Sequence, residues 1–496
     1  MFPLIHVYQF GEVNIEYWEY ALSFVYLVIL WLLMARRKNR LIAKAPEYGY
    51  YLWGMLAKVM GGLFFSLIYF YYYQGGDTIA YYYSAVAMRN LFLVDPIAYL
   101  DQLFGPIALE RLSVYTSETG FPLRYIYADH RSFFVVRLMS PVAILTFGSY
   151  LVSTLLVACL SYLGIWACFR TFVSYFPQLT GKLAICFLFI PSLLFWGSGI
   201  LKDTFTLSAV CWWVHCIDEI FFKKRSGFKK WSFLIISGLL IIELKPYIFM
   251  VLFPVTMLWL FYFRVVRLRN IMIKFVVLPF AVIMLAGASL FVLTNLSAQL
   301  DKFALDEALH TIQITQKDLL KEEAYGRNSF NIGEIDGTWQ SVLSKFPVAV
   351  NAALFRPYMW EARSAIVALS GLENLWVMAV ALFAIFRAGP FFFLRAVAGN
   401  PLLLMCVTFS VLFAFIIGVT TPNFGALVRF KIPLIPFFLS SLYVVGYLAV
   451  LERRYRKENK RFDLEEFRMG TAHLGPTPKR NVKRARPMMR KPSFSA

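Results

Sequence analysis

The sequence predicts an all-α fold, a polytopic transmembrane helical bundle with about eleven membrane-spanning helices. Hydrophobic residues make up 59% and aromatic residues 18% of the 496 positions, and the mean hydropathy is +0.62. Soluble domains contain roughly 45–50% apolar residues. Apolar runs of roughly 17–25 residues, long enough to span a hydrocarbon core of about 30 Å, also recur along the chain. These observations disfavour a soluble multidomain enzyme.

The apolar runs form a membrane domain over residues 1–451. In chain order they cover 20–34, 52–73, 146–168, 183–200, 204–222, 231–244, 248–263, 271–293, 375–386, 402–419 and 432–451. The sixth run is short, and the ninth is short unless it begins near Ile366, so the helix count can change by one. A cleavable signal peptide is not expected, because the first eighteen residues contain no Lys or Arg and no small-residue cleavage site accompanies the first run.

Basic clusters predict the orientation, because short cytoplasmic loops of membrane proteins carry an excess of Lys and Arg. The clusters ARRKNR, FKKRSGFKK and RVVRLR fall on one side if the N-terminus lies outside. We therefore expect a multi-pass protein of the cell inner (plasma) membrane with a cytoplasmic C-terminus. Two long outer loops, about 74–140 and 295–365, are then expected to contain amphipathic helices at the interface. Loops of this length are often functional.

The tail, residues 452–496, is rich in Arg, Lys and Pro and is predicted to be disordered and cytoplasmic. Much of the net charge of +20 lies in this tail and in the short loops. We therefore expect the tail to attract anionic lipid rather than nucleic acid. The six cysteines lie inside apolar runs without CxxC or metal-ligand spacing, and are interpreted as packing residues. No cofactor or metal site is predicted, and a divalent-metal requirement stays open.

The first charged motif at the outer face is GGDT, directly after the second apolar run. Gly75 and Gly76 allow a sharp turn. Asp77 then either caps the following helix or acts as a general base or cation-coordinating group at the membrane boundary.

Two further motifs place lysines at the same face. Lys202 and Asp203 join the fourth and fifth runs. Adjacent helical residues point about 100° apart, so we expect each to pair with another partner. In the motif IIELKPYIF, Pro246 marks a break beside Lys245. Lys245 can bind a phosphate as a point charge, or it can extend to the interface.

Arginines complete the set of candidate residues. Arg356 can bind a pyrophosphate bidentately, with Glu361 orienting it or acting as a base; alternatively the two form an interfacial pair without a role. Arg429 stands at the outer start of the last run, where it either joins the site or only contacts lipid phosphate. The predicted catalytic residues are thus Asp77, Asp203 and Glu361, and the predicted phosphate-binding residues are Lys202, Lys245, Arg356 and Arg429. His215 is interpreted as a packing residue.

A basic pocket with a few acids, open to lipid and water, suits an anionic lipid-linked donor. The sequence contains no GxxxxGK[ST], GxGxxG, HExxH or CxxC motif with the required context. This absence disfavours an ATPase or a soluble-type nucleotide-sugar enzyme.

Several motifs together resemble the polytopic membrane glycosyltransferase and polysaccharide polymerase superfamily, whose members use polyprenyl-linked sugars. They are GGDTIAYY after an early helix, SGILKDT, FRPYMWEA with the later LEN, and LVRFKIPLIPF. The resemblance implies that Asp77 activates an acceptor hydroxyl and that the four basic residues hold the lipid phosphate or pyrophosphate. In the C-type glycosyltransferase pattern, however, the acidic residue follows the first helix. Here it follows the second, so the chain either has an extra N-terminal helix or is more similar to the O-antigen and exopolysaccharide polymerases.

The sequence is therefore compatible with three functions. The first is a glycosyltransferase that transfers sugar from a polyprenyl-phosphate-linked donor to a glycan or lipid acceptor. It would act at the periplasmic or extracytoplasmic face, in cell-envelope polysaccharide or glycan assembly. The alternative to this transferase is an O-antigen or exopolysaccharide polymerase. The second is a lipid-linked glycan flippase or other transporter, which would show inverted repeats. The third is a non-catalytic assembly subunit.

Overall fold

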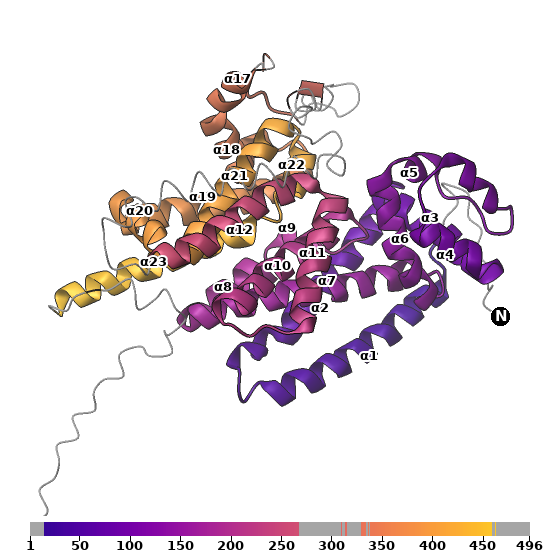
Figure 1. Cartoon of the computed structure of the whole chain (residues 1–496), viewed down its shortest axis with the longest axis horizontal. Coiled ribbons are helices and arrows are strands. Elements are labelled where there is room, and N and C mark those ends of the chain that lie inside the picture. The colour runs from indigo at the N-terminus through magenta and orange to yellow at the C-terminus, as the bar shows by residue number, and fades with distance from the viewer. Residues whose placement is uncertain are drawn as a thin grey trace, which may run out of the picture.

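The computed structural model of the chain describes residues 14–266, 309, 313–314, 329–333, 336, 338–458 and 462. Across these residues the secondary structure is helical, apart from one isolated bridge between Ser329 and Asn423. The predicted all-α class is therefore confirmed. Figure 1 shows a bundle of long helices with a smaller helical lobe at one side.

Seven helices in the described residues are long and apolar enough to cross a membrane. They are α1 (Tyr17–Leu41), the continuous helix Pro46–Tyr72 that contains α2 (Tyr51–Leu67), α7 (Tyr150–Tyr175), α10 (Lys202–Ile217) with η5 (Asp218–Phe222), α19 (Ala365–Ala388), α21 (Pro401–Thr420) and α23 (Ile435–Lys457). The chain is thus a multi-pass membrane protein. The ninth expected segment indeed begins near Ile366, and the last one continues past the predicted boundary at Leu451.

The remaining expected segments are not single full-length spans in the described residues. The fourth is two short helices, α8 (Thr180–Leu188) and α9 (Pro191–Phe195), because Pro191 cannot donate a backbone hydrogen bond within a continuous helix. The sixth and seventh are α11 (Phe228–Leu244) and α12 (Pro246–Val266). Neither meets the length and composition of a full span over its described apolar part. The eighth, 271–293, lies outside the described residues.

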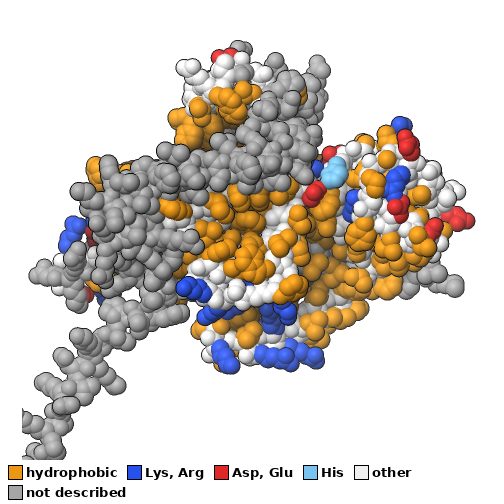
Figure 2. Space-filling model, viewed as in Figure 1, with side chains coloured by type: hydrophobic (Ala, Val, Ile, Leu, Met, Phe, Trp, Pro, Cys, Tyr) orange, Lys and Arg blue, Asp and Glu red, His pale blue; other side chains and the backbone are white. Residues whose placement is uncertain are grey.

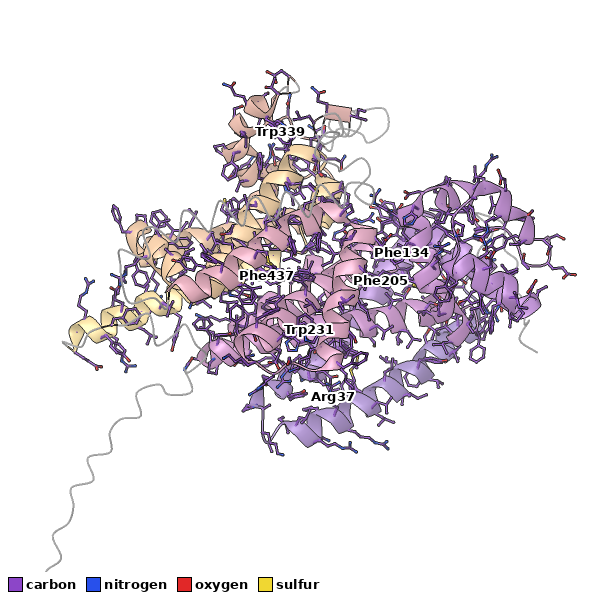
Figure 3. The ribbon with its side chains drawn as sticks, in the orientation of Figure 1. Arg37, Phe134, Phe205, Trp231, Trp339 and Phe437 are labelled. Atoms are coloured by element: carbon purple, nitrogen blue, oxygen red, sulfur yellow. The ribbon has the colours of Figure 1, made fainter. Side chains whose placement is uncertain are left out.

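The first long loop folds into a lobe with its own hydrophobic core. The lobe contains α3 (Asp77–Val94), α4 (Pro96–Phe104), η3 (Leu109–Val114), α5 (Arg124–Ala128) and α6 (His130–Leu145). Tyr82, Met88 and Phe133 belong to its core, and most of α3 is buried. Figure 3 labels Phe134 of α6 and Phe205 of α10 close together where the lobe meets the bundle, and both pack against this core.

The second long loop is described mainly at its end. It contains α17 (Trp339–Ser344), α18 (Phe346–Phe355) and η7 (Met359–Glu361). Helix α18 packs on α21, where the backbone of Ala349 lies against Gly418. Residues 301–323 of this loop fall almost entirely outside the described residues.

Helices α10 and α11 form a hairpin whose two ends differ in chemistry. Asp203 pairs with Lys245 at one end, and Glu219 pairs with Lys230 at the other. We call the first the site end of the bundle and the second the basic end. Figure 2 shows apolar side chains over the middle of the visible face, Lys and Arg along its lower edge, and mixed charges over the lobe.

Candidate functional site

A buried carboxylate, Asp203 in the first turn of α10, lies at the centre of the site. One of its oxygens accepts a hydrogen bond from Lys245 Nζ, and the other lies 2.5 Å from Arg429 Nε. These partners stand 42 and 226 residues away in the chain. A buried charge is costly unless it is paired and hydrogen-bonded. Asp203 meets that condition only because three distant segments come together.

Arg429 extends this network to the surface. It lies in α22 (Phe424–Phe430), and its Nη1 is 2.9 Å from Asp77 Oδ2. The Asp77 side chain is 50% exposed, whereas that of Arg429 is 18% exposed. Burial opposes the charge of Arg429, but Asp203 and Asp77 outweigh this effect and raise its pKa above the ordinary value. One permanently charged guanidinium therefore joins a buried acid to an accessible one.

Asp77 does not cap its helix. It is the first residue of α3, and the capping position belongs to Gly76, whose φ of +96° suits glycine. No side-chain cap bond forms there, and the Asp77 carboxylate accepts a hydrogen bond from Arg429 instead. The capping alternative is therefore wrong, while the expected glycine turn is confirmed.

Lys202 and Asp203 point to different partners, as their helical spacing predicted. Lys202 Nζ lies 3.2 Å from Asp129 Oδ2, in the lobe. Asp129 also caps α6 by accepting a hydrogen bond of 3.0 Å from Ser132 N. Burial acts to raise the pKa of Asp129, but the hydrogen bonds from Ser132 and the charge of Lys202 hold it below the ordinary value. Lys202 thus ties the bundle to the lobe.

Lys245 follows the last residue of α11, directly before Pro246 begins α12. Its side chain is buried, and Nζ lies 4.3 Å from the centre of the Phe430 ring. The alternative in which this side chain extends to the interface is therefore wrong. Burial lowers the pKa of Lys245 to about 8, although Asp203 partly offsets the effect.

Arg356 and Glu361 form a second, separate cluster. Arg356 Nε lies 3.1 Å from Glu361 Oε2, and the guanidinium lies 4.6 Å from the centre of the Phe330 ring. Lys431 Nζ donates to the carbonyl of Arg356 at 3.1 Å and to Asn374 Oδ1 at 2.6 Å. Arg429 and Lys431 thus connect the end of α22 to two different clusters. Arg356 and Glu361 satisfy one another instead of joining Asp203.

The structure therefore brings together five of the seven predicted site residues. Asp77, Asp203, Lys245 and Arg429 share one ion-pair network, and Lys202 lies beside it through its neighbour Asp203. Sequence reasoning missed Asp129, whose only signal was its place before a helix.

Sequence reasoning also missed Lys58, which is buried in α2 and donates to the carbonyls of Leu193, at 3.4 Å, and Gly197. A lysine inside an apolar run could have been identified from the sequence. The packing interpretations agree with the structure: His215 Nδ1 is 2.8 Å from Thr171 Oγ1, and all six cysteines are free and buried.

In the described part of the chain, no three His, Cys, Asp or Glu side chains are grouped so as to hold a metal ion. Comparison with known protein families, with curated proteins and with solved structures finds no match to this chain. Any assignment therefore depends on the chemistry of the residues themselves.

That chemistry combines anion recognition with a candidate base. Arg429 and Lys202 are partly exposed cations, and each is paired with a carboxylate that is about half exposed. An incoming phosphate can compete with Asp77 for Arg429 and with Asp129 for Lys202, since phosphate accepts charge-assisted hydrogen bonds as carboxylate does. The buried Asp203 would keep Arg429 in place during the exchange.

Proposed function

We propose that this chain is an integral membrane glycosyltransferase that transfers a sugar from a polyprenyl-phosphate-linked donor to a glycan or lipid acceptor in cell-envelope assembly. The observation that carries the proposal is the Asp77–Arg429 pair, in which an accessible carboxylate meets a cation anchored on the buried Asp203. Transfer from a lipid phosphate needs a cation for the leaving group and a base for the acceptor. The resemblance of GGDTIAYY and LVRFKIPLIPF to this superfamily involves the same two residues.

In the proposed reaction the donor phosphate binds Arg429 and Lys202, and Asp77 is released from its ion pair. Asp77 then takes the proton of the acceptor hydroxyl as that oxygen forms a bond to the anomeric carbon. The bond from the anomeric carbon to the phosphate oxygen breaks, and the lipid phosphate leaves with the electron pair. Arg429 stabilises the charge that develops on this leaving group. Lys245 and Asp203 act only by holding Arg429.

The proposal includes a finer membrane topology. We propose about eleven spans, an outer N-terminus, a cytoplasmic C-terminus and interfacial helices in the outer loops. The site would then face the periplasmic or extracytoplasmic side of the inner membrane. The α10–α11 hairpin supports this arrangement, because it carries the site residues at one end and the cluster that includes Lys223 and Lys230 at the other.

The decisive experiment uses the purified full-length protein in lipid nanodiscs, with polyprenyl-phosphate and polyprenyl-pyrophosphate sugars as labelled donors. We expect Asp77→Asn to lower sugar transfer by about 10²–10⁴-fold, the usual contribution of a general base. The protein should remain folded, since the Asp77 side chain is half exposed.

Asp101→Asn is the matched control, because Asp101 also pairs with an arginine, Arg111, in the same lobe and is 55% exposed. It should leave transfer unchanged. Full activity of Asp77→Asn, or no transfer by the unaltered protein from any of these donors, would contradict the proposal.

The same assay separates the alternative functions. A transferase adds one sugar unit, whereas an O-antigen or exopolysaccharide polymerase gives a ladder of products. A flippase would move a lipid-linked glycan across a vesicle membrane without forming a glycosidic bond.

A further inference from the structure

A second candidate site lies at the basic end, in a groove between α19, α23 and the start of α8. The cavity has a volume of about 550 Å³. Its apolar lining includes Val380 and Phe383 of α19 and Leu442 of α23. Two cations, Lys182 and Arg387, also line it.

Helix directions place this groove at the basic end. Helix α23 begins at Ile435, four residues after Lys431, and runs for 23 residues, or about 34 Å, away from the site end. Near its far end, Arg453 donates a hydrogen bond to the carbonyl of Arg387. Lys182 lies in the first turn of α8, which follows the end of α7 at Tyr175. Tyr175 contacts Asp218 at the basic end.

Neither cation in the groove forms an ion pair within the described part of the chain. Lys182 Nζ lies 5.4 Å from the centre of the Tyr443 ring, and the Arg387 guanidinium lies 5.4 Å from the centre of the Phe383 ring. Both charges are therefore held against aromatic faces. Both side chains are exposed, Lys182 in the first turn of α8 and Arg387 in the last turn of α19, so a lipid phosphate at the interface can reach them.

We infer that this groove binds an anionic glycerophospholipid from the leaflet at the basic end. The lipid phosphate interacts with Lys182 and Arg387, and an acyl chain lies over the apolar wall of α19 and α23. Basic pockets between transmembrane helices bind lipid head groups in this way. The inference is independent of the proposed transferase site, because a donor phosphate on Arg429 would lie at the opposite end of α23.

The test is native mass spectrometry and lipid exchange on the full-length protein in nanodiscs of phosphatidylcholine with added phosphatidylglycerol. We expect one phosphatidylglycerol to remain bound in preference to phosphatidylcholine. The double variant Lys182→Gln/Arg387→Gln should weaken this binding by about 10-fold or more, since each Lys or Arg beside an anionic lipid adds to the binding affinity.

A matched control removes two other charges at the same end. Lys224 lies in the exposed α10–α11 loop, and Lys229 lies in the first turn of α11. The double variant Lys224→Gln/Lys229→Gln should leave the retained lipid in place. Equal loss in both double variants would overturn the inference, since it would indicate general surface attraction.

A steric variant tests the groove without changing charge. A side chain at Gly446 meets open space, so Gly446→Leu should enter the groove and displace the lipid while the protein stays folded. Undiminished lipid binding by Gly446→Leu would overturn the inference. Competition by soluble glycerol 3-phosphate at similar concentration would overturn the lipid assignment, as would equal retention of phosphatidylcholine.

Discussion

Helix α10 and its continuation η5 carry a fully buried aspartate near each end, and the two are satisfied in different ways. Asp203 at the site end is bonded to Lys245 and Arg429, which belong to distant segments. Asp218 at the basic end accepts a hydrogen bond of 2.5 Å from Tyr175 and lies 2.6 Å from Lys223, only five residues away. Both aspartate side chains are fully buried, and both lie on the same continuous helix.

The two clusters differ in how far they extend through the molecule, and this decides which acid can take part in a larger site. The Asp218 cluster is largely local, because Lys223 and Lys230 also pair with the adjacent Glu219. It fixes the turn of one hairpin. The Asp203 cluster instead joins α10, the α11–α12 break and α22, and continues through Arg429 to the exposed carboxylate of Asp77. Only the second cluster leads from a buried anchor to a half-exposed carboxylate.

The largest expected effect separates these two aspartates. Asp203→Asn leaves the buried Lys245 without its carboxylate, so we expect the free energy of unfolding to fall by about 3–5 kcal/mol. Asp218→Asn should cost only about 1–3 kcal/mol, because Lys223 is 23% exposed and keeps Glu219. Denaturant titration in detergent, followed by tryptophan fluorescence, measures both. Equal losses would show that the difference between local and remote partners has no energetic consequence.

A smaller effect is expected when Arg429 is replaced by lysine. Arg429→Lys keeps the charge but not the planar fork that reaches Asp203 and Asp77 together. We expect donor affinity to fall by about 10-fold, a difference of about 1.4 kcal/mol, with a smaller loss of stability than Asp203→Asn. Binding of labelled polyprenyl phosphate measures the affinity. Lys223→Arg at the basic end is the control, and it should bind donor normally.

The smallest effect concerns pH. Burial lowers the pKa of Lys245 to about 8, so this lysine is charged below about pH 8 and loses its proton as pH rises through that value. Asp203 then loses one partner, and we expect donor binding to weaken above about pH 8. Lys245→Arg stays charged and should remove this alkaline loss. An unchanged alkaline profile in Lys245→Arg would show that Lys245 does not support the site.

Much of the helical architecture could be predicted from the sequence. Long apolar runs need no partner to be recognised, since their length and composition already match the bilayer. The break after α8 was harder to foresee, because Pro191 lies inside an apolar run whose length and composition predict a single transmembrane helix. The lobe was also underestimated, since a compact core depends on contacts between α3 and α6 that a pattern along one helix does not reveal.

The order of amino acids was enough to predict the membrane class, the apolar helices and the charged motifs that would require partners. Which of these charges meet is seen only once the chain is folded. Folding joined Asp77 and Asp203 through Arg429, and it left Arg356 paired with Glu361. Helix formation and ion pairing act over different separations along the chain. Helix formation depends on bonds four residues apart and on local apolarity, whereas an ion pair depends on a few ångströms between residues that the chain separates by hundreds of positions.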